Sequence, residues 1–332
     1  MSDAEVLFER RGAVGLITLN RPKSLNALTH AMCLQMKAQL DVWKDDDNVV
    51  CVIIQGAGDR AFCAGGDIRA LYESGKAGTP YVLDFYRDEY ILNAAIKHYP
   101  KPYMALIHGI VMGGGVGVSV HGFYRVVDKT TTFAMPETGI ALFPDVGASY
   151  FLPRLPGAFG MFLALTGTRL TGADAVHAGL ATHFVPKAKL PELSAAVATN
   201  GVTSLAEFAE PLPPFTLAGE LAAINRCFSA QSVAGILARL AKEGAWGEKM
   251  VATLRAMSPS SVLWSFGIVH RGAGRDLPAC LEAELRLTRQ VTRHPDFAEG
   301  VRAMVIDKDR SPKWSPATIE AVDLRVIEAM LG

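Results

Sequence analysis

Two acidic residues stand out in the stretch FAMPETGIALFPDVG, which spans residues 133–147. Glu137 and Asp145 lie eight residues apart, and each directly follows a proline. A carboxyl group in apolar surroundings has a raised pKa and can act as a general acid or base, although structural ion pairs perturb such groups too. The alternative is an exposed surface loop, and the apolar neighbours argue against full exposure. These neighbours are Met135, Ile140, Leu142 and Phe143.

Two glycine-rich loops are the second chemical feature of the sequence. CAGGD occupies residues 63–67 and MGGGVG occupies residues 112–117, and each comes soon after a predicted strand. Glycine lets a backbone approach a ligand closely and point N–H groups toward it. Two converging N–H groups would form an oxyanion hole that stabilises charge on a carbonyl oxygen. The alternative is a pair of tight strand–helix junctions, and the pattern alone leaves both interpretations open.

Other motifs that the sequence invites fail on a specific residue. A dinucleotide fingerprint needs GxGxxG, and valine occupies the sixth position in both registers around the glycine cluster. A P-loop would need lysine where Gly115 stands, and the GxSxG pattern around Ser119 ends in His121. HExxH is absent, and none of the eight histidines has metal-ligand spacing to another. We therefore expect no metal site, and we expect His108 and His121 to be satisfied structural partners.

Strands and helices alternate over the first 200 residues. A helix is predicted from Thr29, a typical N-cap, because apolar residues recur there at three- and four-residue spacing. Those residues are Met32, Met36, Leu40 and Trp43. The β-branched run VVCVIIQ, residues 49–55, is typical of a fully buried strand. Further predictions are two strands around a turn at Arg11-Gly12, strands over 103–107 and 124–127, and helices over 67–74, 80–97 and through Ser119. This alternation indicates an α/β layered core.

The pattern changes after residue 200. PLPPF at 211–215 interrupts regular structure, and the following segments are amphipathic and helical without a convincing strand. Examples are SVAGILARLAKEG, WGEKMVATLRAM and LPACLEAELRLTRQV. We therefore expect residues 1–200 to form an α/β core with the active site, and residues 201–332 to form a helical region that packs on it.

Composition limits the partners of this chain. Its 332 residues include 33 basic and 33 acidic side chains, so charge gives no reason to expect nucleic acid or an anionic membrane. The uncharged stretch 103–124 is long enough for a membrane span, but its glycines and histidines favour a buried strand, a loop and a helix. We expect neither a nucleic-acid nor a membrane partner.

Cysteine spacing and the N-terminal residues suggest a compartment. The cysteine count is odd, the spacing is scattered and no CxxC pair occurs, so a disulfide framework or zinc site is not expected. The cysteines are Cys33, Cys51, Cys63, Cys227 and Cys280. MSDAEVLFERRG has early acids and no apolar run, unlike a secretory signal. A cytoplasmic location is expected.

Several long blocks, in order, resemble the crotonase (enoyl-CoA hydratase/isomerase) superfamily and, within it, the 3-hydroxyisobutyryl-CoA hydrolases. They are AFCAGGDIRALYE, KPYMALIHGIVMGGGVGVSVHG, FAMPETGIALFPDVGASYFLPRLPG and DFAEGVRAMVIDKDRSPKW. The resemblance covers nearly the whole chain, with only about 190–225 nondescript. It implies a spiral of ββα turns forming two roughly perpendicular sheets, with helices around them and a C-terminal helical region. It also implies a coenzyme A thioester as substrate and no cofactor beyond it.

The resemblance implies roles for individual residues. The oxyanion donors would be the N–H groups of Gly66 and Gly114. Hydratases of the superfamily use two glutamates, one at the position of Glu137 and one where this chain has Gly117. Asp145 stands where hydratases have glycine, and the hydrolase pattern has that acid too. The remaining implied substrate contacts are Glu89 near the acyl group and Ala64, Asp67 and Ile68 near the pantetheine.

The resemblance therefore implies hydrolysis of a short-chain 3-hydroxyacyl-CoA, with 3-hydroxyisobutyryl-CoA, a valine-degradation intermediate, expected first. Glu137 would either attack the carbonyl to form a mixed anhydride or activate a water, and the sequence leaves both routes open. Alternatives are an enoyl-CoA hydratase or isomerase on the same fold and a non-catalytic acyl-CoA-binding protein. Family members trimerise through C-terminal helices, which the longer helical tail here would instead cover, so a homo-oligomer stays an open expectation.

Overall fold

The computed structural model describes residues 4–332 and divides them into two compact units of interleaved segments. The first unit holds the described residues up to Asp67, then Asp88–Phe133 and Arg169–Thr216. The second holds Ile68–Arg87, Ala134–Thr168 and Leu217–Gly332. The expected boundary near residue 200 lies inside the segment Arg169–Thr216 of the first unit, although all of 217–332 falls in the second unit. Packing of the C-terminal helices on the predicted core stays a prediction.

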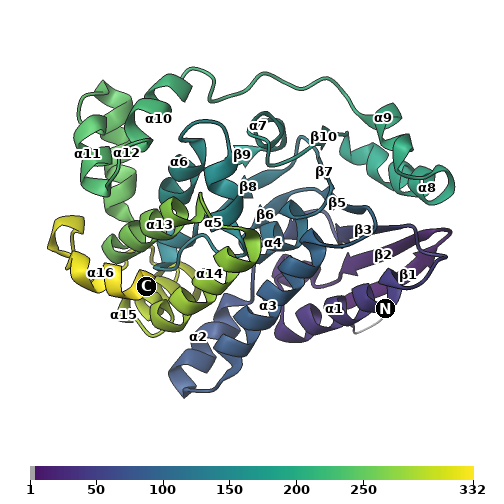
Figure 1. The fold of residues 1–332 in the computed structure, drawn as a ribbon, viewed down its shortest axis with the longest axis horizontal. Helices are drawn as coiled ribbons and strands as arrows, with labels where there is room; N and C mark the ends of the chain where they lie inside the picture. The colour runs from purple at the N-terminus through teal and green to yellow at the C-terminus, as the bar shows by residue number, and fades with distance from the viewer. Residues whose placement is uncertain (1–3) are drawn as a thin grey trace. The chain divides into compact units, whose positions relative to one another are not determined.

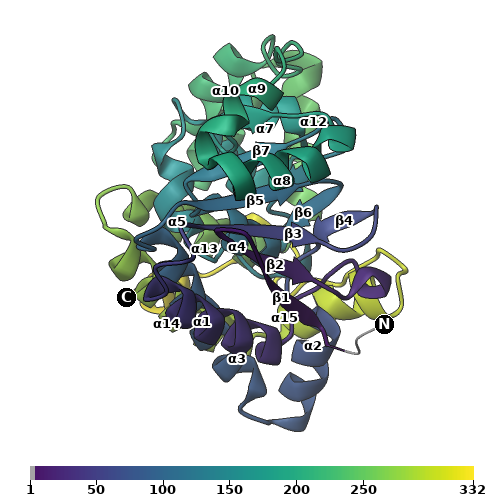
Figure 2. The same cartoon turned by 90° about the vertical axis from the view of Figure 1, so that its right-hand side faces the viewer.

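Two sheets form the centre of the first unit. The larger sheet has the order β1-β2-β3-β5-β7-β10 and is parallel except for the β1–β2 hairpin. Its strands are β1 Val6–Arg11, β2 Val14–Leu19, β3 Cys51–Gly56, β5 Tyr103–Ile107, β7 Tyr124–Val127 and β10 His183–Phe184. Figure 2 shows β1, β2, β3 and β5 following one another across this sheet. The smaller sheet has the order β4-β6-β8-β9, with β4 Ala61–Cys63, β6 Ile110–Met112, β8 Thr132–Ala134 and β9 Leu170–Thr171.

From β3 to β8, successive strands alternate between the two sheets. Three parallel strands of the larger sheet are each followed by a short strand of the smaller one, in the pairs β3 and β4, β5 and β6, and β7 and β8. Helices follow the first two pairs, α2 Ile68–Ala77 and α3 Tyr81–Lys97 after β4, and α4 Gly114–Val120 after β6. The chain therefore winds as a spiral of ββα turns, which confirms the fold class predicted from the resemblance.

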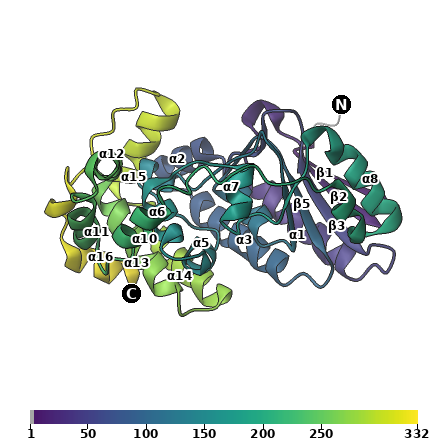
Figure 3. The ribbon, with the colours of Figure 1, turned by 90° about the horizontal axis from the view of Figure 1, so that it is seen from above.

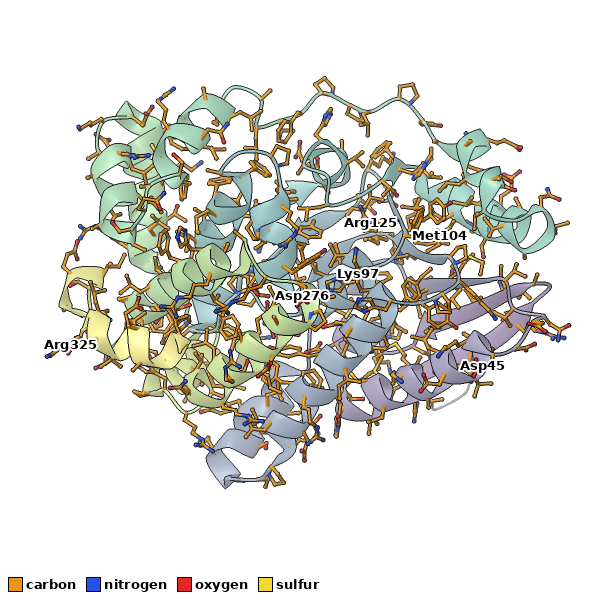
Figure 4. The ribbon with its side chains drawn as sticks, in the orientation of Figure 1. Asp45, Lys97, Met104, Arg125, Asp276 and Arg325 are labelled. Atoms are coloured by element: carbon orange, nitrogen blue, oxygen red, sulfur yellow. The ribbon has the colours of Figure 1, made fainter. Side chains whose placement is uncertain are left out.

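The larger sheet is buried on both faces, which explains its nearly continuous apolar strands. On one face, alternate residues of β2, β3 and β5 pack in one cluster with α8 Leu190–Asn200, which Figure 3 shows alongside these strands. Met104 is among them (Figure 4). On the other face of β2, Gly15 lies against the ring of Trp43 from α1 His30–Lys44. Thr29 caps α1 by accepting a hydrogen bond from the Met32 N–H at 3.3 Å, as predicted.

Helices make up the C-terminal part of the chain, and no strand follows residue 184 in the part that the structure describes. Figure 1 shows them in green to yellow. They are α10 Leu221–Phe228, α11 Val233–Leu240, α12 Gly244–Ala256, α13 Pro259–Gly272, α14 Leu277–Val291, α15 Pro295–Val301 and α16 Leu324–Leu331. The remaining helices are α5 Ala148–Phe151, α6 Phe159–Thr166, α7 Gly172–His177 and α9 Leu205–Phe208. The predicted C-terminal helical region is confirmed.

The uncharged stretch 103–124 forms β5, β6 and α4, so its interpretation as a strand, a glycine loop and a helix is confirmed. Within residues 4–332 no helix combines the length and apolar character that a membrane span requires.

Candidate active site

The two glycine loops leave the same edge of the smaller sheet. Each loop directly follows one of two neighbouring parallel strands, since Ala61 of β4 pairs with Ile110 of β6. The carboxyl ends of parallel strands meet at one edge, so the loops start side by side. The sequence placed these loops after strands 49–55 and 103–107, but the three-residue strands β4 and β6 lie between. Strands of three residues are too short to show a hydrophobic period in the sequence.

The backbone N–H groups of Gly66 and Gly114 are free to bind a ligand. Gly66 lies in an isolated bridge to Leu28, whose bonds use the neighbouring Gly65 carbonyl and Asp67 N–H. Gly114 is the first residue of α4, where an N–H has no acceptor inside the helix. In residues 4–332 neither N–H has a hydrogen-bond acceptor. Gly113 makes the turn into α4 with a φ of +48°, which glycine adopts without steric cost. Their role as oxyanion donors stays a prediction.

The carboxylate of Glu89 packs directly on Gly114. Glu89 lies on α3 and is 2% exposed, so it is not a solvated helix acid. A Cβ atom built on Gly114 would overlap its Oε1, so a larger residue there would force this carboxylate to move. A hydrogen bond of 2.6 Å between His30 Nε2 on α1 and the Asp88 carboxylate joins the two helices next to Glu89. The structure therefore brings Glu89 together with one predicted oxyanion donor.

Two of the three predicted pantetheine contacts, Ala64 and Asp67, make bonds that hold the first glycine loop. Asp67 forms an ion pair of 2.9 Å with Arg21, and the guanidinium of Arg21 also donates to the carbonyl of Ala27 at 2.6 Å. The Ala64 N–H donates to the Leu25 carbonyl at 3.0 Å. Ile68 begins α2 in the second unit. These contacts hold the first glycine loop, and contact with pantetheine stays a prediction.

Glu137 and Asp145 are both buried in the second unit, at 5% and 3% exposure, which confirms the expectation drawn from their apolar neighbours. Glu137 begins a 3₁₀ helix, Glu137–Ile140. Burial raises the pKa of Glu137 well above its usual value, and the charge of Asp145 raises it further. Its Oε2 atom has no hydrogen-bond partner within the described residues. A buried carboxyl with a raised pKa and an open oxygen is suited to take a proton or attack a carbonyl carbon.

Another buried carboxyl, Glu284 on α14, was not identified from the sequence. It is fully buried, and its oxygens accept from the Gly147 N–H at 2.7 Å, the Ser149 N–H at 3.0 Å and the Ser149 Oγ–H at 2.5 Å. Burial raises its pKa to about 8, the Ser149 and Gly147 hydrogen bonds lower it, and the Asp145 charge raises it. An acid on the apolar stripe of an amphipathic helix was the available signal.

Helix α13 holds the segment between Glu137 and Asp145. The Leu142 carbonyl accepts from the Ser261 hydroxyl and from Trp264 Nε1–H, the latter at 3.1 Å. The Ser258 N–H donates to the Thr138 carbonyl at 3.3 Å. Residues 257–261, with the sequence MSPSS, therefore hold the carboxylate segment directly.

The remaining candidates have the structural roles expected of them. Ser119 donates back along its own helix to the Gly115 carbonyl at 2.8 Å, which is no arrangement for a nucleophile. His108 Nε2 donates to the Gly58 carbonyl at 2.9 Å.

Comparisons with known proteins agree with this geometry. The family model described as enoyl-CoA hydratase/isomerase matches residues 14–331. The mitochondrial 3-hydroxyisobutyryl-CoA hydrolase of Danio rerio is 49% identical over 98% of this chain and 88% of that protein. Its Homo sapiens counterpart is 46% identical over 96% of this chain and 86% of that protein. These names include the word mitochondrial and lend no support to a cytoplasmic location, which stays a prediction.

Solved structures share the whole fold. A carnitinyl-CoA dehydratase from Mycobacterium thermoresistibile superposes with a TM-score of 0.95 at 42% identity, covering 99% of this chain and 97% of that one. An enoyl-CoA hydratase from Rhodobacter sphaeroides 2.4.1 gives 0.93 at 39% identity with the same coverage. With the spiral fold, the paired glycine loops and the family match over nearly its full length, the chain belongs to the enoyl-CoA hydratase/isomerase family of the crotonase superfamily.

Proposed function

We propose that this protein hydrolyses 3-hydroxyisobutyryl-CoA to 3-hydroxyisobutyrate and coenzyme A. The observation that carries the proposal is the pair of buried acids Glu137 and Asp145, combined with Gly117 where the family's hydratases have their second glutamate. The second carboxylate thus lies on the same segment as the first. The names of curated relatives at 46% to 49% identity support the same reaction.

In the proposed reaction, the thioester carbonyl oxygen accepts hydrogen bonds from the N–H groups of Gly66 and Gly114. As a nucleophile adds to the carbonyl carbon, negative charge develops on this oxygen, and both donors stabilise it. Removing one such donor typically costs about 3 kcal/mol of barrier. The free N–H groups of the two loops support this role.

Glu137 acts by one of two routes, as a general base or as a nucleophile. As a general base it takes a proton from water, the water oxygen bonds to the carbonyl carbon, and the C–S bond breaks to release the thiolate, which then gains that proton. As a nucleophile its oxygen bonds to the carbonyl carbon and the C–S bond breaks to release the thiolate. Water then hydrolyses the mixed anhydride, and the proton released in that step goes to the thiolate. A single turnover in ¹⁸O-labelled water separates the routes, because only the second can leave ¹⁸O in Glu137.

We assign Asp145 to positioning the water or moving its proton, with contact to the substrate 3-hydroxyl. Glu89 would bind the acyl group beside Gly114, where its carboxylate already packs. Ala64, Asp67 and Ile68 would line the pantetheine path. In both routes the chain supplies Glu137 and the oxyanion donors, and water is the only reactant besides the thioester, so we propose that no metal or cofactor takes part. Turnover should therefore survive dialysis against a chelator.

Hydration of an enoyl-CoA is the second candidate, because two solved structures of the same fold are named as a hydratase and a dehydratase. The two reactions differ in their products: hydrolysis releases a free thiol, whereas hydration removes the enone absorbance and leaves the thioester intact. Replacing Asp145 with glycine, as in hydratases, tests whether this residue decides between hydrolysis and hydration. Gain of crotonyl-CoA hydration would place the enzyme close to the hydratases.

The deciding experiment is a panel of acyl-CoAs with thiol detection. We expect 3-hydroxyisobutyryl-CoA to be cleaved fastest, followed by 3-hydroxypropionyl-CoA, and crotonyl-CoA to be left unchanged. Glu137→Gln should abolish cleavage while the protein stays folded, as measured by circular dichroism. Tight binding of every acyl-CoA without any turnover would instead indicate a non-catalytic binding protein. The elution volume of the purified chain would decide whether a homo-oligomer forms.

A further inference from the structure

The chain turns sharply directly after Asp145. Val146 has a φ of +53°, which is rare for a β-branched side chain, and Gly147 follows with a φ of +87°. The Ala148 N–H donates to the Asp145 carbonyl at 2.8 Å and closes the turn. A residue in this conformation persists only when its surroundings determine it, and such residues cluster at functional sites.

Glu284 fixes the conformation of this turn by hydrogen bonds from α14, the helix whose N-cap residue Asp276 is labelled in Figure 4. One carboxylate oxygen accepts the Gly147 N–H, and the other accepts both the N–H and the hydroxyl of Ser149. These donors follow Val146 directly in the chain. Helix α13 also packs closely on this turn, because a Cβ atom on Gly272 would overlap the Ser149 carbonyl oxygen.

We infer that Glu284 is a positioning residue for Asp145: it holds the strained turn 145–149 in the one conformation that directs the Asp145 carboxylate for thioester hydrolysis. The inference deepens the proposed function and rests on it. All three groups that meet Glu284 are donors, and the ionised carboxylate of a glutamate offers both of its oxygens as acceptors. The amide of glutamine would present its NH₂ group to one of these donors, and aspartate would be too short to reach them.

Three variants test the inference in the thiol-release assay. Glu284→Gln should lower kcat about 100-fold, the usual cost of a displacement of about 1 Å, with KM nearly unchanged. Ser149→Ala removes only the hydroxyl donor and should lower kcat about tenfold, which provides a milder variant should the first fold poorly. The matched control is Asp174→Asn. Asp174 is 1% exposed and likewise accepts backbone N–H and hydroxyl groups, from Thr171 and Thr216. This control should lose stability and keep kcat.

A double-mutant cycle separates positioning from general support of the fold. If Glu284 acts through Asp145, Glu284→Gln should cause little further loss of kcat in an Asp145→Asn background. The same 100-fold loss in both backgrounds, or an unchanged kcat with only a lower melting temperature, would overturn the inference.

A second measurement needs no substrate and keeps the failure of the inference distinct from failure of the proposed function. Val146→Gly relieves the strain, because glycine adopts a positive φ freely. The loss of stability caused by Glu284→Gln, measured in urea, should therefore be smaller in a Val146→Gly background. Equal losses in both backgrounds would show that Glu284 does not hold this turn. If the wild-type protein cleaves no acyl-CoA while this coupling is present, the proposed function fails and the hold on the turn stands.

Discussion

The glycine loops of the first unit and the carboxylate segment of the second are held in different ways. The loops end adjacent parallel strands, and the residues that hold them lie within about fifty positions of one another, as in the pairing of Ala61 with Ile110. The carboxylate segment is held from far along the chain. Its bonds to Ser261, Trp264 and Glu284 span 119, 122 and 137 positions.

The difference follows from the chemistry each region supplies. A backbone N–H needs only a chain path that leaves it without an acceptor, and glycines after a strand provide that path. A side-chain carboxyl must also be desolvated, aimed and kept near a like charge, and each of these costs free energy. The C-terminal helices offset that cost, so in the second unit the helical region serves the candidate active site.

The largest effect should come from breaking the local support of a glycine loop. In Gly115→Ala the new methyl group would overlap the backbone carbonyl of Cys63 in β4, which cannot move without disturbing the strand pair. We expect a loss of at least about 3 kcal/mol in the free energy of unfolding, the upper end for overpacking. Urea denaturation checks it, and a stability within error of wild type would contradict the packing described.

The neighbouring Gly114→Ala is the matched control. Its methyl group would meet the Oε1 end of Glu89, which is flexible, and Leu28 Cδ1 at 3.2 Å. The carboxylate can swing away, so we expect less than about 1 kcal/mol of destabilisation but a clear loss of turnover. In a Glu89→Ala background the same substitution should cost still less stability. A Gly114→Ala protein as unstable as Gly115→Ala would contradict the expected difference between overlap with a side chain and overlap with the backbone.

A smaller effect is expected where a C-terminal helix touches the carboxylate segment. A Cβ atom on Gly300 of α15 would lie 2.6 to 2.8 Å from backbone atoms of Ile140, at the end of the 3₁₀ helix that Glu137 begins. Gly300→Ala should destabilise the protein by about 1–3 kcal/mol and lower kcat more than it raises KM. Gly274→Ala, at a glycine with open space around it, is the control. Equal kinetics in the two variants would show that α15 does not position Glu137.

The same contrast explains how much the sequence could predict. Local signals were sufficient for the Thr29 cap, the buried strand β3 and the burial of Glu137 and Asp145. The residues that hold the carboxylate segment lie on amphipathic helices whose pattern says only that one face is buried. Glu284 shows the limit: a charge on that face is visible in the sequence, but its partners 135 and 137 positions away are not. The short strands β9 and β10 were missed for a related reason, since two residues have no period.

Glu284 also predicts how stability depends on pH. Its pKa of about 8 in the folded state lies above the unfolded value near 4.5, so the folded state binds the proton more tightly. The stabilisation that this proton provides is fully present below pH 4.5 and is lost as the pH rises toward 8, by roughly 1.4 kcal/mol per pH unit. The stability of wild type relative to Glu284→Gln should therefore fall over that window. Urea midpoints at several pH values check it, and a constant difference would contradict it.

The smallest expected effect is a displacement of a pH–rate profile. Glu137 must be ionised in either proposed route, and burial together with the Asp145 charge raises its pKa. The kcat/KM of wild type should therefore rise with pH through an apparent pKa above the usual carboxyl value. Asp145→Asn removes a like charge, lowers the pKa of Glu137 and moves this limb to lower pH, even though turnover is slower. Asp296→Asn, which removes another buried carboxyl of the same unit, should leave the limb in place. A limb that stays in place in Asp145→Asn would mean that the two acids do not share one electrostatic environment, and that the carboxylate segment is two independent sites.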